Sequence, residues 1–260
     1  MPEDSKELTF FNEIGGDVSP LSEEQKRAVA EFKNEGMGQE AKGLPITYPR
    51  VDILHQGTVQ YKFRDSDTVV KQFAAVILHI EASKVWWPTK FGAGKDSGGF
   101  PKCFSRDLFT PDPNSEMKQS DSCAKCPNNA YGSDVREDGS SGRGKSCKEV
   151  RRIFFIPAGH LSAHWMAVPP SSLRGLGTYL NRIADAGVKR PQEIVTVFKL
   201  KGTSNQDGIS YSELLLEPGP KVPDNVLFMM LGQRESILKM IEVAAPMTEE
   251  EYKGKDAPKT

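Results

Sequence analysis

The sequence predicts a mainly β protein with helices, of the α+β class. Three observations support this prediction. Stretches from Val51 onward alternate apolar with polar residues, as strands with one buried face do. The stretch after Pro169 and Pro170 instead repeats leucines at helical spacing. Hydrophobic residues make up 37% of the 260 residues, so the chain can build a core and is neither collagen-like nor wholly disordered.

Residues 1–44 are predicted to form an N-terminal arm and a helix. Residues 1–20 show little periodicity and are expected to be poorly ordered. A helix is predicted to begin at Ser22, which suits an N-cap and has Gln25 three residues later as its capping-box partner. Gly36 is the expected stop of this helix.

Residues 45–216 are predicted to form the main body. Its first strand, Val59–Phe63, alternates apolar with polar and cationic residues, and its second, Phe73–Trp87, is dense in β-branched and aromatic residues. A polar insertion at 88–149 follows. The remaining predicted elements are strands at 151–156 and 165–168, a helix from Leu173 to Gly187, strands at 193–201 and 209–216, and, within residues 217–260, a C-terminal helix near 224–243 and a flexible tail.

This order of elements is that of an OB-like five-stranded barrel. The insertion lies between strands two and three, a helix lies between strands three and four, and further helices flank the barrel. Other α+β folds share the same order.

All four cysteines, Cys103, Cys123, Cys126 and Cys147, lie in the insertion with the spacing C-x19-C-x2-C-x20-C. A CxxC pair can place two thiolates on one metal ion, and Zn²⁺ prefers four such ligands in a tetrahedron. The insertion is too polar to fold on an apolar core of its own. Bound zinc supplies about 10–16 kcal/mol of apparent folding free energy in small domains. We therefore expect one structural zinc on the four cysteines.

Two alternatives to this zinc site remain open. Two disulfides would also order the insertion, although the N-terminal residues show no secretory signal and disulfides are typical of oxidising compartments. A redox-active CxxC belongs at a strand–helix junction, whereas this one lies in a polar loop. The histidines, His55, His79, His160 and His164, lie outside the cysteine window and are interpreted as surface or barrel residues rather than ligands.

Basic charge gathers in the middle of the chain. Residues 45–216 carry 23 basic and 17 acidic side chains, whereas both ends are net acidic. This distribution favours a body that binds polyanions. Aromatic residues are interleaved with these cations. Proteins that bind single strands use such aromatic rings to stack the bases and such cations to contact the phosphates. The candidate nucleic-acid contacts are Lys62, Arg64, Trp86, Trp87, Lys90, Phe91, Lys102, Phe104, Arg106, Tyr131, Arg143, Lys145 and Arg151.

Some of these aromatic residues are expected to face solvent and others the core. Trp86 and Trp87 are adjacent on a predicted strand, so one should face the core and the other solvent. The stacking candidates of the insertion, where little core is expected, are Phe91, Phe100, Phe104 and Tyr131.

The segment Gly139–Ser146 matches the phosphate-loop pattern G-x-x-x-x-G-K-[ST]. A phosphate loop follows a buried strand and precedes a helix. Here polar residues precede the segment and a predicted strand follows it. We interpret it as a basic, glycine-rich segment able to contact backbone phosphates, and not as a nucleotide-binding loop.

An OB-like strand order with a four-cysteine insertion resembles the zinc-containing single-stranded-DNA-binding domains. These include the C-terminal domain of the replication protein A large subunit and the zinc-bearing phage single-stranded-DNA-binding proteins. The resemblance covers residues 50–216 as a pattern and rests on Cys103, Cys123-Ala124-Lys125-Cys126 and Cys147. The outer spacings are longer than usual for a compact zinc ribbon, and the C-terminal tail is mixed in charge rather than strongly acidic.

The leading hypothesis is a non-catalytic, sequence-nonspecific single-stranded DNA-binding protein of phage or mobile-element replication or recombination, in the cytoplasm of the host cell. Its expected partners are single-stranded DNA or RNA and replication or recombination proteins. No membrane association is expected, since the longest apolar run is far shorter than the roughly 20 residues that cross a bilayer. The alternatives are a nuclease-like, nucleic-acid-processing enzyme with a structural zinc and a protein-interaction module.

Overall fold

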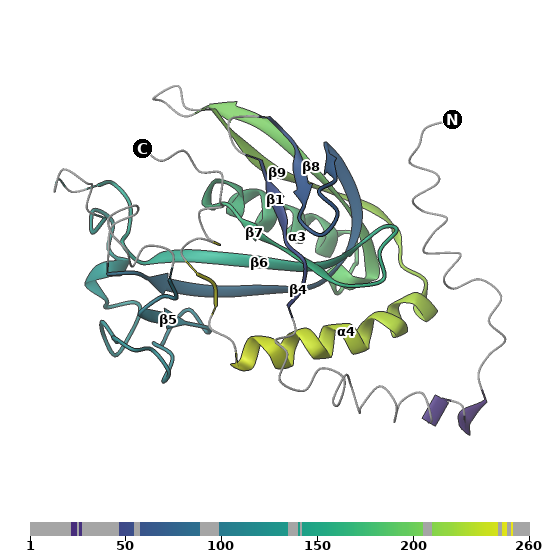
Figure 1. Ribbon diagram of the computed structural model, residues 1–260, viewed down its shortest axis with the longest axis horizontal. Helices are drawn as coiled ribbons and strands as arrows, with labels where there is room; N and C mark the ends of the chain where they lie inside the picture. The colour runs from purple at the N-terminus through teal and green to yellow at the C-terminus, as the bar shows by residue number, and fades with distance from the viewer. Residues whose placement is uncertain are drawn as a thin grey trace.

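In the computed structural model, all the paired strands of the described sheets run antiparallel, and helices pack beside them (Figure 1). The structure describes residues 22–24, 26–27, 47–54, 58–88, 99–134, 140, 142–204, 210–243, 246–248 and 251. Within these ranges two sheets and two long helices occur. The coarse prediction of a mixed strand and helix protein is therefore confirmed.

The larger sheet has six strands. Five of them follow the order β7-β6-β4-β8-β9, and the sixth, β5, pairs with the end of β4. The strands are β4 (Gln72–Trp86), β5 (Cys103–Ser105), β6 (Lys148–Pro157), β7 (His164–Val168), β8 (Ile194–Ser204) and β9 (Ser210–Lys221). The predicted polar insertion thus separates β4 from β6.

The smaller sheet contains three short strands in the order β1-β2-β3. They are β1 (Val51–Ile53), β2 (Tyr61–Phe63) and β3 (Val69–Val70). The apolar residues Tyr61 and Phe63 of β2 are buried and join the core of the larger sheet. This sheet therefore packs as a cover over part of the larger one.

Two helices cover opposite faces of the larger sheet. The residues of β4 alternate between two core clusters, as the side chains of a strand point alternately to its two faces. Helix α3 (Leu173–Asp185) and the smaller sheet contribute to the cluster on one face. Helix α4 (Asp224–Val243) contributes to the cluster on the other and runs along the sheet (Figure 1).

The larger sheet is not closed into a barrel, so the predicted OB-like barrel is not confirmed. β7 and β9 form the two ends of the strand order, with β4 and its partners between them. The physical reason is that both faces of β4 are buried by other elements. A barrel buries one face by closing the sheet on itself. Here α3 and the smaller sheet bury one face of the larger sheet, and α4 buries the other.

Both long helices agree with the sequence. Gly187 has a φ of +83°, a conformation that favours glycine, just after the end of α3. The C-terminal helix has the predicted bounds. Of the predicted N-terminal helix, Glu23, Glu24, Lys26 and Arg27 are helical, and its other residues apart from Ser22 lie outside the described ranges. In the described part of the chain neither long helix combines the length and apolar character needed to span a membrane.

Replacing Tyr179 by phenylalanine is expected to lower the free energy of unfolding by about 1–3 kcal/mol. The hydroxyls of Tyr179 and Thr196 lie 2.6 Å apart in the core, and the substitution leaves the fully buried Thr196 hydroxyl without this partner. Urea unfolding measures the loss. The double variant Tyr179→Phe/Thr196→Val removes both polar groups and should recover part of it. Equal stability of wild type and Tyr179→Phe would contradict the expectation.

Candidate metal centres and nucleic-acid interface

The insertion extends from the paired ends of β4 and β6. Near its end, β4 pairs with β5 on one side and with the start of β6 on the other. Cys103 begins β5 opposite Trp86, and Cys147 directly precedes β6. Sheet pairing therefore fixes the two outer cysteines beside the end of β4, where Figure 1 shows β5 and the insertion.

The two inner cysteines lie where the insertion turns back toward the sheet. Cys126 directly precedes a short 3₁₀ helix, η1 (Pro127–Asn129), and Cys123 lies one turn earlier. The backbone N–H of Cys147 donates a hydrogen bond to the carbonyl of Asn128 at 2.8 Å. This bond holds the last cysteine against the segment that carries the inner pair.

All four cysteines line one pocket. Burial, followed by the charges of the three other cysteines, raises the pKa of the Cys147 thiol to about 12. Burial also raises the pKa of Cys103. The four sulfurs are thus close enough to repel one another as thiolates, a repulsion that a bound cation would remove.

The donor set of this pocket suits a soft metal ion. No disulfide joins the four cysteines, and four thiols are the ligand set that structural Zn²⁺ sites use. The pocket therefore brings together the four residues predicted from sequence.

The two adjacent tryptophans do not divide into one core and one solvent residue. Trp86 and Trp87 are both half-buried. Trp86 lines the cysteine pocket, and Trp87 packs against a small core and donates its indole N–H to the carbonyl of Gly99 at 3.0 Å. The prediction was wrong because β4 ends at Trp86, so strand alternation does not extend to Trp87.

Phe104 lies in a small core at the base of the insertion. Phe104 is 6% exposed and packs with Val85, Val150 and Met247. Its predicted role in stacking bases was therefore wrong. The expectation of an exposed Phe104 failed because β5 pairs with the end of β4, and this pairing buries Phe104. The polar composition of the insertion gave no sign of this burial. Lys90 and Phe91, also predicted contacts, lie outside the described residues.

Other aromatic rings of the insertion do face solvent. Tyr131 is 82% exposed and Phe100 61%, as predicted, and Phe109 is 71% exposed. The sequence reasoning missed Phe109. Its loop is organised by the Asp107 carboxylate, which accepts hydrogen bonds from the backbone N–H groups of Phe109 and Thr110 at 2.8 Å. An aspartate two residues before an exposed aromatic is a turn signal that could have found it.

The described predicted cations divide among the insertion, the smaller sheet with the turn after β2, and β6. Lys145 lies over the ring of Tyr131, with its Nζ 4.7 Å from the ring centroid, and the neighbouring Arg143 is exposed. We call Tyr131, Arg143 and Lys145 the Tyr131 patch. The other described cations form ion pairs, namely Lys62–Asp67, Arg64–Asp52, Lys102–Glu116, Arg106–Asp112 and Arg151–Glu149. The structure thus brings Tyr131 and Lys145 together, with Arg143 exposed two residues before Lys145.

The segment that resembles a phosphate loop folds back on the preceding turn. The backbone N–H of Gly132 donates to the carbonyl of Gly144 at 2.8 Å, and Lys145 donates to the side-chain oxygen of Asn129 at 3.2 Å. Strand β6, rather than a helix, follows the segment. Lys145 therefore belongs to the Tyr131 patch.

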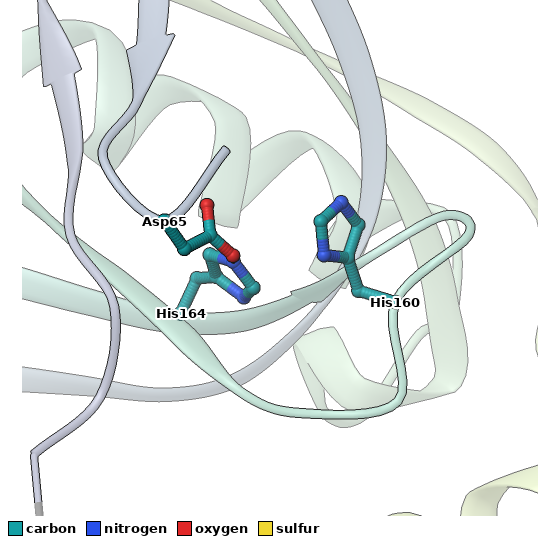
Figure 2. Close-up of side chains that lie close together, drawn as sticks. All are labelled: Asp65, His160 and His164. Atoms are coloured by element: carbon teal, nitrogen blue, oxygen red, sulfur yellow. The ribbon is translucent and has the colours of Figure 1, made fainter. Parts of the chain in front are cut away.

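A second group of potential metal ligands lies away from the cysteines. Asp65, His160 and His164 each offer one ligand atom, and these atoms all lie within 4.8 Å of one another. Figure 2 shows the three side chains converging from the turn after β2, the β6–β7 turn and the start of β7. Among the described residues, this cluster could hold a metal ion.

The contacts within this cluster are polar and partly buried. The Asp65 carboxylate lies 2.8 Å from Nε2 of His164, which is fully buried. Burial is the largest single influence on the pKa of Asp65 and raises it, but the hydrogen bond to His164, the charges of His164 and His160 and a backbone hydrogen bond together lower it below its usual value. Burial lowers the pKa of His160, and the charge of His164 adds to this effect. His160 is therefore neutral near pH 7, the form that binds metals.

The sequence reasoning missed this cluster. It interpreted His160 and His164 as surface or barrel residues rather than ligands. The i, i+4 spacing of the histidines was the available signal, but they lie in a turn and a strand rather than on one helical face. Their carboxylate partner comes from the other sheet, 99 residues away, and sequence spacing does not reveal such a pairing.

Comparisons with models of protein families, with curated proteins and with solved structures find no match in any of the three. The function proposed below therefore rests on the residues of this chain alone.

Proposed function

We propose that the protein binds single-stranded DNA without sequence preference, and that the insertion folds around a structural zinc ion held by Cys103, Cys123, Cys126 and Cys147. The observation that carries the proposal is the Tyr131 patch, an exposed ring with a cation over it in the cysteine-rich insertion. Proteins that hold single strands combine such rings, on which bases stack, with cations that track the phosphates.

Zinc has a structural role in this proposal. The Tyr131 patch lies on the segments that lead from Cys126 and into Cys147, so ligation of these cysteines would hold both sides of the patch in place. Four thiolates around zinc leave no open coordination position, so this ion would not take part in chemistry.

The charge of the main body suits a polyanion. Residues 45–216 have six more basic than acidic side chains. Two of the predicted cations, Lys62 and Lys102, form exposed ion pairs. Such pairs are worth little and can exchange a carboxylate for a phosphate. Phosphate contacts supply affinity without reading sequence, because every nucleotide carries the same backbone.

Titration of the tryptophan fluorescence with oligonucleotides tests the proposal. Single-stranded DNA should bind more tightly than duplex of the same length, and raising the salt concentration should weaken binding steeply, since bound phosphates release counterions. Single-stranded RNA distinguishes a DNA binder from a general single-strand binder. Preference for duplex, or no binding of any nucleic acid at low salt, would overturn the proposal.

Replacing Tyr131 by alanine is expected to cost about 1–3 kcal/mol of binding to single-stranded DNA, the usual contribution of one stacking ring. The melting temperature should barely change, because Tyr131 is 82% exposed and its loss opens no cavity. Phe228→Ala is the matched control, since Phe228 is 61% exposed but lies on α4. Equal loss of affinity in both variants, or none in Tyr131→Ala, would place the stacking surface elsewhere.

A further inference from the structure

The cluster of Asp65, His160 and His164 carries an inference that does not depend on nucleic-acid binding. Two imidazoles and one carboxylate are a ligand set that divalent first-row transition metals prefer, whereas Mg²⁺ and Ca²⁺ favour oxygen ligands. Three segments deliver these groups to one point (Figure 2).

The hydrogen bonds of His164 orient it as a ligand. Its Nδ1 lies 3.1 Å from the carbonyl oxygen of Ser162, and since a carbonyl only accepts, Nδ1 carries a proton. The other nitrogen, Nε2, faces Asp65 at 2.8 Å. Since a carboxylate only accepts, Nε2 donates this hydrogen bond and would give up its proton to bind a metal ion. Backbone carbonyls fix metal-binding histidines in this way, with the second nitrogen pointing at the metal.

The ring of His160 is also held in place. Gly159, with a φ of +83°, allows the β6–β7 turn that presents His160. The imidazole stacks on Phe63, with an interplanar angle of 15° and centroids 5.6 Å apart. An ion pair between His164 and Asp65 would account for the position of these two side chains but not for that of His160. A metal ion would be bound by all three side chains and so accounts for the whole cluster.

We propose that Asp65, His160 and His164 bind a divalent transition-metal ion, with Zn²⁺ and Fe²⁺ as the best-fitting classes. His164 closes the buried side of the site, whereas Asp65 is 31% exposed and His160 is half-buried. Coordination positions on that open side are available to water or to an anionic ligand, as in metal sites with three protein ligands. The ion would also tie the smaller sheet, through Asp65, to β7 of the larger one.

Metal content of tag-free protein, measured by mass spectrometry after loading with zinc and desalting, tests the proposal. Wild type should hold about one equivalent more than His160→Ala or Asp65→Asn, since three ligands make one site. His79→Ala is the matched control, a half-buried histidine of β4 outside the cluster, and should match wild type. Equal metal content in all four proteins would overturn the proposal.

Cobalt separates this site from the cysteines. Co²⁺ bound by thiolates absorbs in the near-ultraviolet, and His160→Ala should keep that absorption while losing one equivalent of cobalt. A Cys126→Ser variant should lose that absorption together with one equivalent of cobalt, and should keep the equivalent bound by Asp65, His160 and His164. The failure of one site is thus distinguishable from the failure of the other.

A measurement on wild-type protein covers the case in which the variants do not fold. Diethyl pyrocarbonate modifies accessible neutral imidazoles, and peptide mass spectrometry reads the modification of each histidine. Added Zn²⁺ should protect His160 at least several-fold and leave His79 unchanged. Equal modification of His160 with and without metal would contradict the proposal.

Discussion

Replacing Cys123 by serine is expected to remove zinc from the cysteine pocket and to unfold most of residues 99–147. Zinc supplies about 10–16 kcal/mol of apparent folding free energy in small domains, far more than the other contacts of this polar segment. The small core around Phe104 includes residues of β4 and β6 and does not extend to the turns that carry Cys123 and Cys126. Metal analysis and limited proteolysis measure the two effects.

Ser122→Ala is the control for this substitution, since it changes the neighbouring side chain and keeps all four thiols. It should retain zinc and resist protease as wild type does. The larger sheet has its own core, so the Cys123→Ser protein should still show β-sheet circular dichroism. Zinc-free wild-type protein whose cysteines form two disulfides would refute this interpretation of the pocket.

Replacing Phe198 by alanine is expected to lower the free energy of unfolding by about 3–5 kcal/mol, the usual cost of truncating a buried aromatic ring. Phe198 is fully buried in β8 and stacks on Phe73, with centroids 4.7 Å apart. It also contacts Phe155 at a centroid distance of 5.0 Å. The three rings come from β4, β6 and β8, so the substitution weakens the centre of the larger sheet.

Denaturant unfolding measures this loss, with Phe228→Ala as the control. Phe228 is exposed on α4, and its truncation should change stability by less than about 0.5 kcal/mol. A change of similar size in both variants would mean that the aromatic cluster does not dominate the core.

Elements with a strong local period could be predicted from the sequence. β4, β6, α3 and α4 all lie close to their predicted positions, because the spacing of their apolar residues is a property of the segment alone. The topology could not be predicted. Whether a sheet closes depends on what covers its faces, and the apolar pattern of α4 does not show which face it covers.

The candidate sites were predictable to different degrees. The cysteines were predicted because four of one rare residue type in a short window is a signal in the sequence itself. Phe104 was misplaced because its burial depends on pairing between β5 and β4. The cluster of Asp65, His160 and His164 was missed because it depends on how two sheets pack, and no local pattern records that packing.

The far end of the chain braces the base of the insertion. Met247 is buried against Val85, Phe104 and Val150, and Arg106 donates a hydrogen bond to the carbonyl of Ile241 near the end of α4. The orientation of the insertion on the sheet therefore depends on residues about a hundred positions beyond it. A protease cut between α4 and Met247, or a fusion partner that displaces Met247, would therefore disturb the cysteine pocket without altering any residue between 88 and 149.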